Sequence, residues 1–149
     1  MKRSGRIDVI LIVLILYLLG LTQGCSGVNE AVKSTVPGGP LLVEPPNAVY
    51  APRKLLSTSP SQLFVLTNPS SNSGSAIITS VETKSDQFLL DQGESTCPTV
   101  GTLPAGLSCK IAVQFAPNTA GKQTATLAIN DNAANSPQTV KLEGTGMRP

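Results

Sequence analysis

The sequence predicts an all-β domain, a Greek-key β-sandwich of about seven to eight strands. Short apolar runs alternate with polar residues at a period of two, most clearly in Cys109–Phe115. Clusters of Gly, Pro, Asn and Ser separate these runs at short intervals. No window of a dozen residues after Pro40 shows helical periodicity. These three observations together favour strands throughout the domain.

Two short edge elements are expected first, Leu41–Glu44 and Ala48–Ala51. Pro45 and Pro46 lie between them, and prolines suit an edge strand because they remove N–H groups that would otherwise pair with another chain. The longer strands are then expected at Gln62–Thr67, Ala76–Val81, Phe88–Leu90, Cys109–Phe115, Thr124–Ile129 and Thr139–Glu143.

Turn-forming residues close these strands. A type I turn is expected at Leu103–Gly106, because Pro and Gly are placed there as that turn prefers. Asn118–Gly121 and Asn130–Pro137 are expected to turn the chain before and after the next strand. Gly144 and Gly146 are expected to end the last strand.

The interior must be filled by small and β-branched side chains, because aromatic residues make up only 3% of the chain and Trp is absent. Such a composition suits a thin sandwich better than a broad helical core. The alternation of the strands assigns nine residues to this core: Phe64, Leu66, Ile111, Val113, Phe115, Leu127, Ile129, Val140 and Leu142.

Residues 1–24 resemble a bacterial lipoprotein signal peptide. Three basic residues within Met1–Asp8 precede an apolar run from Val9 to Leu21. At about 1.5 Å per residue this run covers roughly 20 Å, which is short of a hydrocarbon core of about 30 Å. Gly24 and Cys25 match the cleavage pair of such signals, in which the cysteine is acylated. The resemblance therefore implies Cys25 as the lipidation site.

Thr22 departs from the usual lipoprotein pattern, which has Leu three residues before the cysteine. An ordinary leader, or an uncleaved membrane anchor with an incidental cysteine, is the alternative interpretation. Residues 25–40 are expected to be a flexible tether and residues 41–149 the sandwich domain. The expected location is a membrane-anchored lipoprotein facing the periplasm or the cell surface. By the same resemblance, Ser26 implies the outer membrane in a host with two membranes.

The composition excludes several classes of function. The chain has no histidine, which removes Ser-His and Cys-His nucleophile systems and histidine metal sites, and no lysine has a serine three residues before it. Three of the 11 basic and one of the 9 acidic residues lie in the leader, so the remaining chain is formally neutral. We therefore expect no catalytic residues, no cofactor, no small-molecule substrate and no nucleic-acid partner.

Two clusters of polar residues could still suggest chemistry. Asn130-Asp131-Asn132 groups oxygen atoms that calcium accepts, but it lacks a glutamate at the spacing of a known loop, so a plain turn is expected. Four carboxylates that could support glycosidic chemistry lie close in sequence, although nothing places them in one cleft: Glu82, Asp86, Asp91 and Glu94. Arg53 and Lys54 are expected on a solvated edge and not in a binding patch. No metal site is expected anywhere in the chain.

Cys97 and Cys109 flank a loop that contains the Pro-Gly turn. In an exported protein this pair predicts a disulfide, which would stabilise the fold by roughly 3 kcal/mol in the chain-entropy model. The alternative is two separate thiols, one of them buried as a small hydrophobic residue. If Cys97 and Cys109 pair, Cys25 is left without a disulfide partner, and acylation would explain its presence.

Five runs together carry a resemblance to a known family: Thr67-Asn68, Ala105–Pro117, Thr119–Gly121, Leu127–Ala133 and Ser136–Gly146. They resemble the bacterial choice-of-anchor D repeat, which is similar to the abnormal-spindle/Hydin-type (ASH) and major-sperm-protein (MSP) immunoglobulin-like domains. The resemblance covers roughly residues 47–146, in a single copy, whereas family members are usually tandem. It implies an immunoglobulin-like sandwich with a structural or interaction role, and it supplies no catalytic residues.

Three hypotheses for function follow. The first is a non-catalytic, lipid-anchored envelope or cell-surface protein whose immunoglobulin-like domain serves as a structural or protein-interaction module, with an unidentified protein partner. The second is a periplasmic chaperone-like sandwich that binds client strands at a sheet edge. The third, an enzyme, has no residue to support it.

Overall fold

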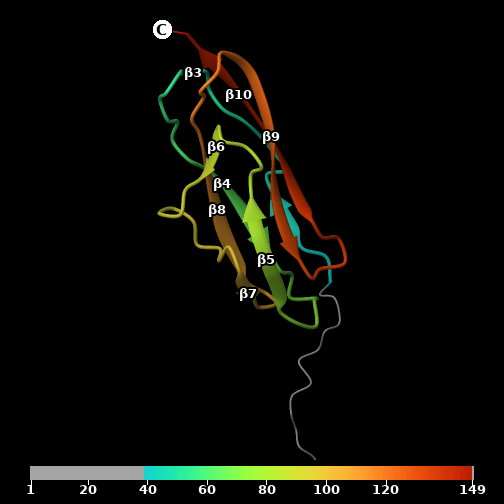
Figure 1. Ribbon diagram of the computed structural model, residues 1–149. Helices are drawn as coiled ribbons and strands as arrows, with labels where there is room; N and C mark the ends of the chain where they lie inside the picture. Colours follow the sequence, from blue (N-terminus) through green and yellow to red (C-terminus); the bar gives the residue numbers. More distant parts are fainter. Residues whose placement is uncertain (1–38, 149) are drawn as a thin grey trace, which may run out of the picture. The chain divides into compact units, whose positions relative to one another are not determined.

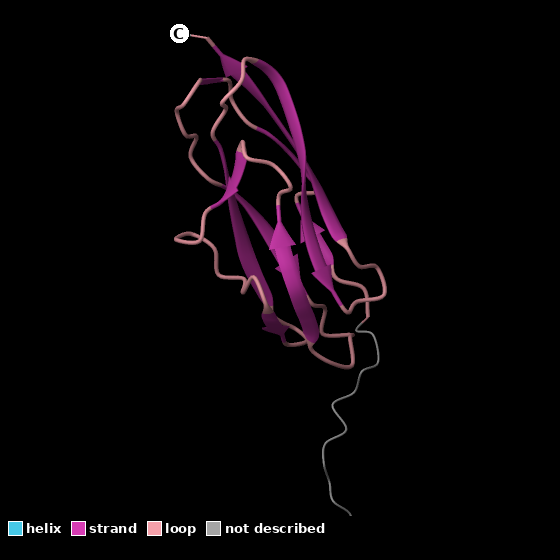
Figure 2. Cartoon of the chain, in the orientation of Figure 1, coloured by secondary structure: helices cyan, strands magenta, loops and turns pink. Residues whose placement is uncertain are grey.

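The structure is a computed structural model that describes residues 39–148, and over this range the chain is entirely strands, turns and loops (Figures 1 and 2). The leader, Cys25 and almost all of the expected tether lie outside the described residues. None of the residues from 39 to 148 forms a helix long and apolar enough to cross a membrane. The prediction of an all-β immunoglobulin-like sandwich is confirmed.

Ten strands form two sheets. The four-stranded sheet is antiparallel in the order β1-β4-β8-β6, with the bounds β1 Leu42–Glu44, β4 Gln62–Thr67, β8 Ser108–Phe115 and β6 Phe88–Leu90. The six-stranded sheet has the order β2-β10-β9-β5-β7, with β3 also on β10. Its bounds are β2 Asn47–Val49, β3 Arg53–Lys54, β5 Ala76–Glu82, β7 Gly101–Leu103, β9 Gly121–Asp131 and β10 Gln138–Met147.

The chain changes sheet between β1 and β2. β1 pairs with β4 in the four-stranded sheet, and β2 and β3 then pair in parallel with β10 in the other. Pro45 and Pro46 lie at this crossing, where they interrupt the first ladder before the second begins. As a result β10 is paired on both sides, by β9 and by β2 with β3.

The core lies between the two sheets. All nine residues that the alternation assigns to it are at most 1% exposed. The structure adds Tyr50 and Phe88, whose rings pack with that of Phe115 at centroid distances of 5.9 Å for Tyr50 and 4.8 Å for Phe88. Tyr50 Oη donates a hydrogen bond to the backbone oxygen of Val113 at 2.8 Å. This aromatic cluster ties the segment after β2 to both β6 and β8.

The sequence predicted fewer strands than the structure has. β3 and β7 were missed because they are only two and three residues long and show no alternation of apolar side chains. The second edge element is Asn47–Val49 instead of Ala48–Ala51. Tyr50 continues its alternation, with a buried ring and an N–H that donates to the oxygen of Glu143 at 2.7 Å.

The last two strands are longer than predicted. β9 begins at Gly121 and continues to Asp131, so Gly121 belongs to the strand and Asn130 does not begin the turn. β10 continues to Met147, so the expectation that Gly144 and Gly146 end it was wrong. Both glycines pair with β9 in regular register, and both sit where a side chain would collide with a neighbour.

The turn before β8 also differs in type. Leu107 donates its backbone N–H to the oxygen of Pro104, so the turn spans Pro104–Leu107. Gly106, its third residue, has a φ of +79°. A positive φ at that position belongs to a type II turn and not to the type I turn that was expected.

Candidate interaction surface

A disulfide joins Cys97 to Cys109, with their Cα atoms 4.9 Å apart, and this confirms the predicted pairing. It fixes the segment after β6 along the free edge of β8. There the backbone N–H groups of Thr96 and Cys97 both donate to the oxygen of Lys110, at 2.8 and 2.9 Å. The edge of β8 beyond the short strand β6 is thereby covered by the protein itself.

A second anchor of the same segment is the carboxylate of Asp91. Its Oδ2 accepts hydrogen bonds from Ser61 Oγ at 2.7 Å and Gln114 Nε2 at 2.8 Å, and its Oδ1 accepts one from the Gly93 N–H at 3.0 Å. The hydrogen bond from Ser61 is the main cause that lowers the pKa of Asp91 below its ordinary value, against a smaller effect of burial. Asp91 is therefore a structural anion that joins three segments.

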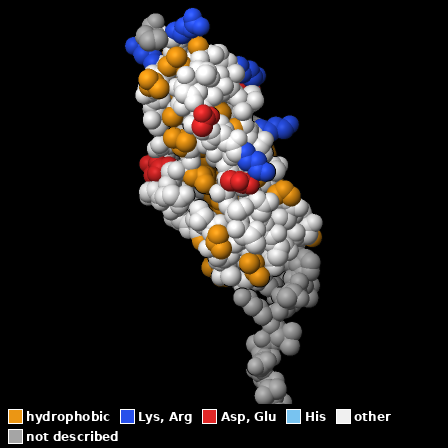
Figure 3. All heavy atoms as spheres, viewed as in Figure 1, with side chains coloured by type: hydrophobic (Ala, Val, Ile, Leu, Met, Phe, Trp, Pro, Cys, Tyr) orange, Lys and Arg blue, Asp and Glu red, His pale blue; other side chains and the backbone are white. Residues whose placement is uncertain are grey.

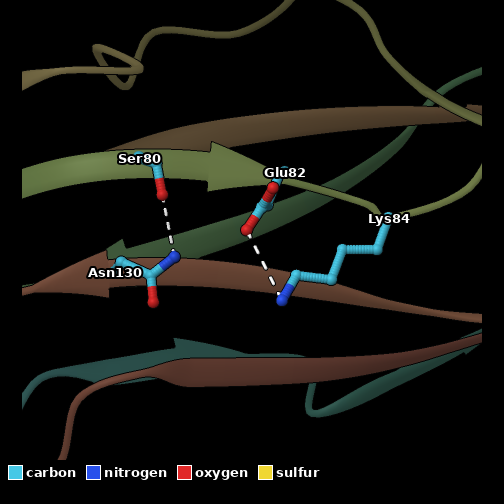
Figure 4. A network of polar contacts seen from close by, with 4 residues as sticks. All are labelled: Ser80, Glu82, Lys84 and Asn130. Carbon is cyan, nitrogen blue, oxygen red and sulfur yellow. Dashed lines mark hydrogen bonds and ion pairs between the residues drawn. The ribbon is translucent and has the colours of Figure 1, made fainter.

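The Asn130-Asp131-Asn132 cluster is occupied by the fold. Asp131 Oδ1 accepts from the N–H of Ala133 at 2.7 Å, and Asn132 Oδ1 accepts from the N–H of Ile77 at 2.7 Å. Asn130 Nδ2 donates to Ser80 Oγ at 2.8 Å (Figure 4). The Asp131 and Asn132 oxygens therefore already accept from backbone N–H groups, and the cluster joins the end of β9 to β5 and to the turn that follows.

The four candidate carboxylates do not form one site. Glu82 lies beside Lys84, with Oε1 3.7 Å from Nζ (Figure 4), and Asp86 Oδ2 accepts from Asn118 Nδ2 at 2.7 Å. Asp91 is engaged as described above, and Glu94 is exposed in the following loop. Within residues 39–148, no three His, Cys, Asp or Glu side chains lie close enough together to hold a metal ion.

The two sheets differ in their solvent-facing sides. On the four-stranded sheet, four large apolar side chains point outward: Leu42 (54% exposed) on β1, Leu63 (43%) and Val65 (37%) on β4, and Leu89 (43%) on β6. We call Leu42, Leu63 and Val65, which lie on the neighbouring strands β1 and β4, the apolar patch. Leu89 lies two strands from β4 and is separated from it by Gln114 of β8. Solvent-facing sides of antiparallel sheets are ordinarily polar. Figure 3 shows hydrophobic side chains at several places on the face of the molecule in view.

The apolar patch is bordered by polar groups. Thr67 Oγ1 and Ser108 Oγ form a hydrogen bond of 2.8 Å at one end, and the Asp91 cluster lies toward the other. Pairing places Glu44, Val65 and Lys110 side by side across β1, β4 and β8. An apolar centre with a polar rim is the usual arrangement of a protein-binding surface.

The outer side of the six-stranded sheet also carries exposed apolar side chains, Val49 (69% exposed) on β2 and Met147 (43%) on β10, but they stand at separate places. Val49 lines a shallow hollow of about 580 Å³ over β2, β9 and β10, where its neighbours include the polar residues Thr124, Thr126, Lys141 and Glu143. Lys122 Nζ lies 2.7 Å from Glu143 Oε1 beside it. The hollow has the solvated surface expected of an exposed sheet, so the apolar patch is the better candidate for binding.

The apolar patch was not found from the sequence, although a signal was present. Leu63, Phe64, Val65 and Leu66 form an uninterrupted apolar run in β4. Such runs are typical of strands that are covered on both faces, whereas alternation indicates one wet face. Phe64 and Leu66 fill the core, and Leu63 and Val65 are left for a surface contact.

Comparison with known proteins agrees with the fold. The sequence profile of the HYDIN/CFA65/VesB-like Ig-like domains matches residues 56–145, more than half of the chain. A search of curated proteins gave no significant match.

Three solved structures have a similar fold. A protein of unknown function from Porphyromonas gingivalis W83 has a TM-score of 0.59 at 12% identity, over 78% of this chain and 51% of its own. The ASH/PapD-like domain 7 of human CEP192 has a TM-score of 0.55 at 13% identity, over 76% and 89%. The VesB protease of Vibrio cholerae has a TM-score of 0.55 at 19% identity, over 70% and 31%. The chain thus spans about half of the Porphyromonas protein and under a third of VesB, and these identities show likeness of fold alone.

Proposed function

The chain belongs to the HYDIN/CFA65/VesB-like family of Ig-like domains, and from this premise we propose that it acts by binding a protein and not by chemistry of its own. The observation that carries this proposal is the apolar patch of Leu42, Leu63 and Val65 on a face that solvent would otherwise cover. Among the candidates for chemistry, the side chains of Asp86, Asp91 and Asn132 accept hydrogen bonds from other parts of the fold. The resemblance to choice-of-anchor D repeats, which suggests the same kind of role, is part of this proposal.

Cross-linking of the full chain in the cell envelope, followed by mass spectrometry, tests this proposal. Leu63→Lys places a charge in the middle of the apolar patch without touching the core, so cross-links to the partner should be lost. Thr126→Lys, on the outer side of the six-stranded sheet, is the matched control and should keep them. An unchanged cross-linking pattern in Leu63→Lys would show that binding does not use this face.

We further propose that the protein is exported and held on a membrane by acylation of Cys25, with residues 25–40 as the tether. The Cys97–Cys109 disulfide supports export, because disulfides persist in oxidising compartments. Each buried methylene of an acyl chain contributes about 0.8 kcal/mol, so several chains hold a protein on a bilayer. Cys25→Ala should accumulate as a longer, unlipidated precursor, and a mature mass unaffected by the substitution would contradict the proposal.

The alternative, a chaperone-like sandwich that binds client strands, would need an open sheet edge. The edge strands β1, β2, β6 and β7 have three residues each, and β10 is paired on both sides. β1 and β7 leave residues 62–64 of β4 and 79–82 of β5 without a ladder partner on their outer side. Because each of these edges is only three or four residues long, it offers few backbone groups to an added strand, and we favour binding through a face. A client that is released when it folds, and is insensitive to Leu63→Lys, would instead favour the chaperone.

A further inference from the structure

The apolar patch is self-complementary, and we propose that its partner is a second copy of this chain, bound face to face through the four-stranded sheet. This inference rests on the proposed function and names the partner of the same surface. It commits to a two-fold symmetric dimer in which Leu63 and Val65 of the two copies meet at the axis.

The proposed dimer is based on the row of Glu44, Val65 and Lys110 across β1, β4 and β8. Glu44 pairs with Val65, and Val65 pairs with Lys110, so an acid and a base stand one strand away from Val65 on opposite sides. Both charged side chains are exposed, and neither forms an ion pair with any other residue in the described range. An apolar residue between two unpaired opposite charges is a surface that can complement itself.

Symmetry fixes how two such rows can meet. In a face-to-face dimer the two-fold axis lies in the plane of the contact. A two-fold axis along β4 places β1 of one copy over β8 of the other. Residues at the same level along the strand then face each other. Glu44 of each copy then faces Lys110 of the other, which makes two ion pairs, while Val65 faces Val65. Aligned packing of this kind is common for the faces of two sheets.

The other simple axis, across the strands through Val65, is disfavoured. It would bring Glu44 against Glu44 and Lys110 against Lys110, and like charges placed together oppose binding. The charges therefore select one arrangement among those that the apolar residues would allow.

The dimer with its two-fold axis along β4 is compatible with two copies anchored in the same membrane. An axis along β4 keeps the same end of the strands at the same end of the dimer, so Leu41, where each tether enters its domain, lies at one end in both copies. Leu42, Leu63 and Val65 provide a small apolar centre, which indicates weak association in solution. Anchoring in one bilayer raises the effective concentration and favours the dimer.

Co-purification of two differently tagged full-length copies from the same membranes tests the dimer. Wild-type copies should co-purify. Glu44→Lys alone gives a face with two positive charges, Lys110→Glu alone gives two negative charges, and each should reduce self-association about tenfold or more. The two variants expressed together should restore co-purification, because each then supplies the charges that the other lacks.

Lys141→Glu is the matched control, since it makes the same charge change on the other sheet and should leave self-association unchanged. Restoration by the mixed pair also shows that both variants fold. Failure of wild-type copies to co-purify, or failure of the mixed pair to restore what the single variants lose, would overturn the dimer. If wild-type copies stay apart while a different protein cross-links in a Leu63-dependent manner, the dimer is wrong and the proposed binding function stands.

Discussion

The ring of Phe115 occupies the space that a side chain at Gly144 would need. A Cβ atom on Gly144 would lie 2.6 Å from Phe115 Cε1 and 2.7 Å from Cζ, far inside van der Waals contact. Gly144 is buried in β10, in the sheet opposite that of Phe115. This contact lets the largest side chain of β8 reach the backbone of the facing sheet.

Gly144→Ala should therefore destabilise the domain by about 1–3 kcal/mol, the usual cost of overpacking a well-filled core. Gly74→Ala is the matched control, because nothing lies within 4 Å of its added Cβ. Urea unfolding of the two variants and the wild type measures the effect. Equal midpoints for Gly144→Ala and Gly74→Ala would mean that the Phe115 ring can move aside freely.

The same contact explains where the sequence misled the prediction of strand ends. Glycine is a common turn residue, so Gly144 and Gly146 were expected to stop the last strand. Their physical role is close packing: a Cβ on Gly146 would collide with the backbone oxygen of Thr119. The inward residues of β8 were predicted correctly from its alternation, although Ala112 on its other face is buried as well. Close packing depends on the opposite sheet, which the local sequence does not show.

Loss of the Cys97–Cys109 disulfide should cost roughly 3 kcal/mol in the chain-entropy model, for a sequence separation of 12 residues. The double variant Cys97→Ser/Cys109→Ser should unfold at a lower urea concentration than the wild type. Addition of a reductant should destabilise the wild type and leave the double variant unchanged. Two thiols that react freely with a labelling reagent in the folded wild type would contradict the disulfide.

The candidate surface was less predictable than the disulfide. The pairing of Cys97 and Cys109 could be predicted because both flank one loop in a chain whose N-terminal residues resemble an export signal. The row of Glu44, Val65 and Lys110 joins residues from three strands, and it exists only in the observed register. A shift of one residue in either pairing would turn Val65 or its neighbours to the other face. Sequence alone does not give that register.

Stability in acid should depend on Asp91. Its pKa is lowered in the fold, chiefly by the hydrogen bond from Ser61, relative to about 3.9 in an unfolded chain. The charged form thus stabilises the fold above about pH 4, and this contribution is lost as the pH falls further. Urea unfolding should show Asp91→Asn less stable than wild type at pH 7, with a smaller difference at pH 3. Glu94→Gln, in the same exposed loop, should show no such change, and a difference for Asp91→Asn that stays constant with pH would contradict the assignment.

Stability in base should depend on Tyr50. Burial raises the pKa of its phenol above the ordinary value of about 10, because the charged form is poorly solvated in the core. A raised pKa in the fold means that the stabilising effect is fully present below about pH 10 and is lost as the pH rises beyond it. The wild type should therefore lose stability above pH 10 more steeply than Tyr50→Phe, which cannot ionise at this position.

At neutral pH the wild type should be more stable than Tyr50→Phe. Tyr50→Phe keeps the packing against Phe88 and Phe115 but loses the hydrogen bond to the Val113 oxygen, at a cost of about 1 kcal/mol. Unfolding curves of the two proteins at pH 7 and pH 11 should thus converge or cross. Parallel loss of stability in both proteins over this range would show that Tyr50 ionises in the folded state and that the aromatic cluster is open to water.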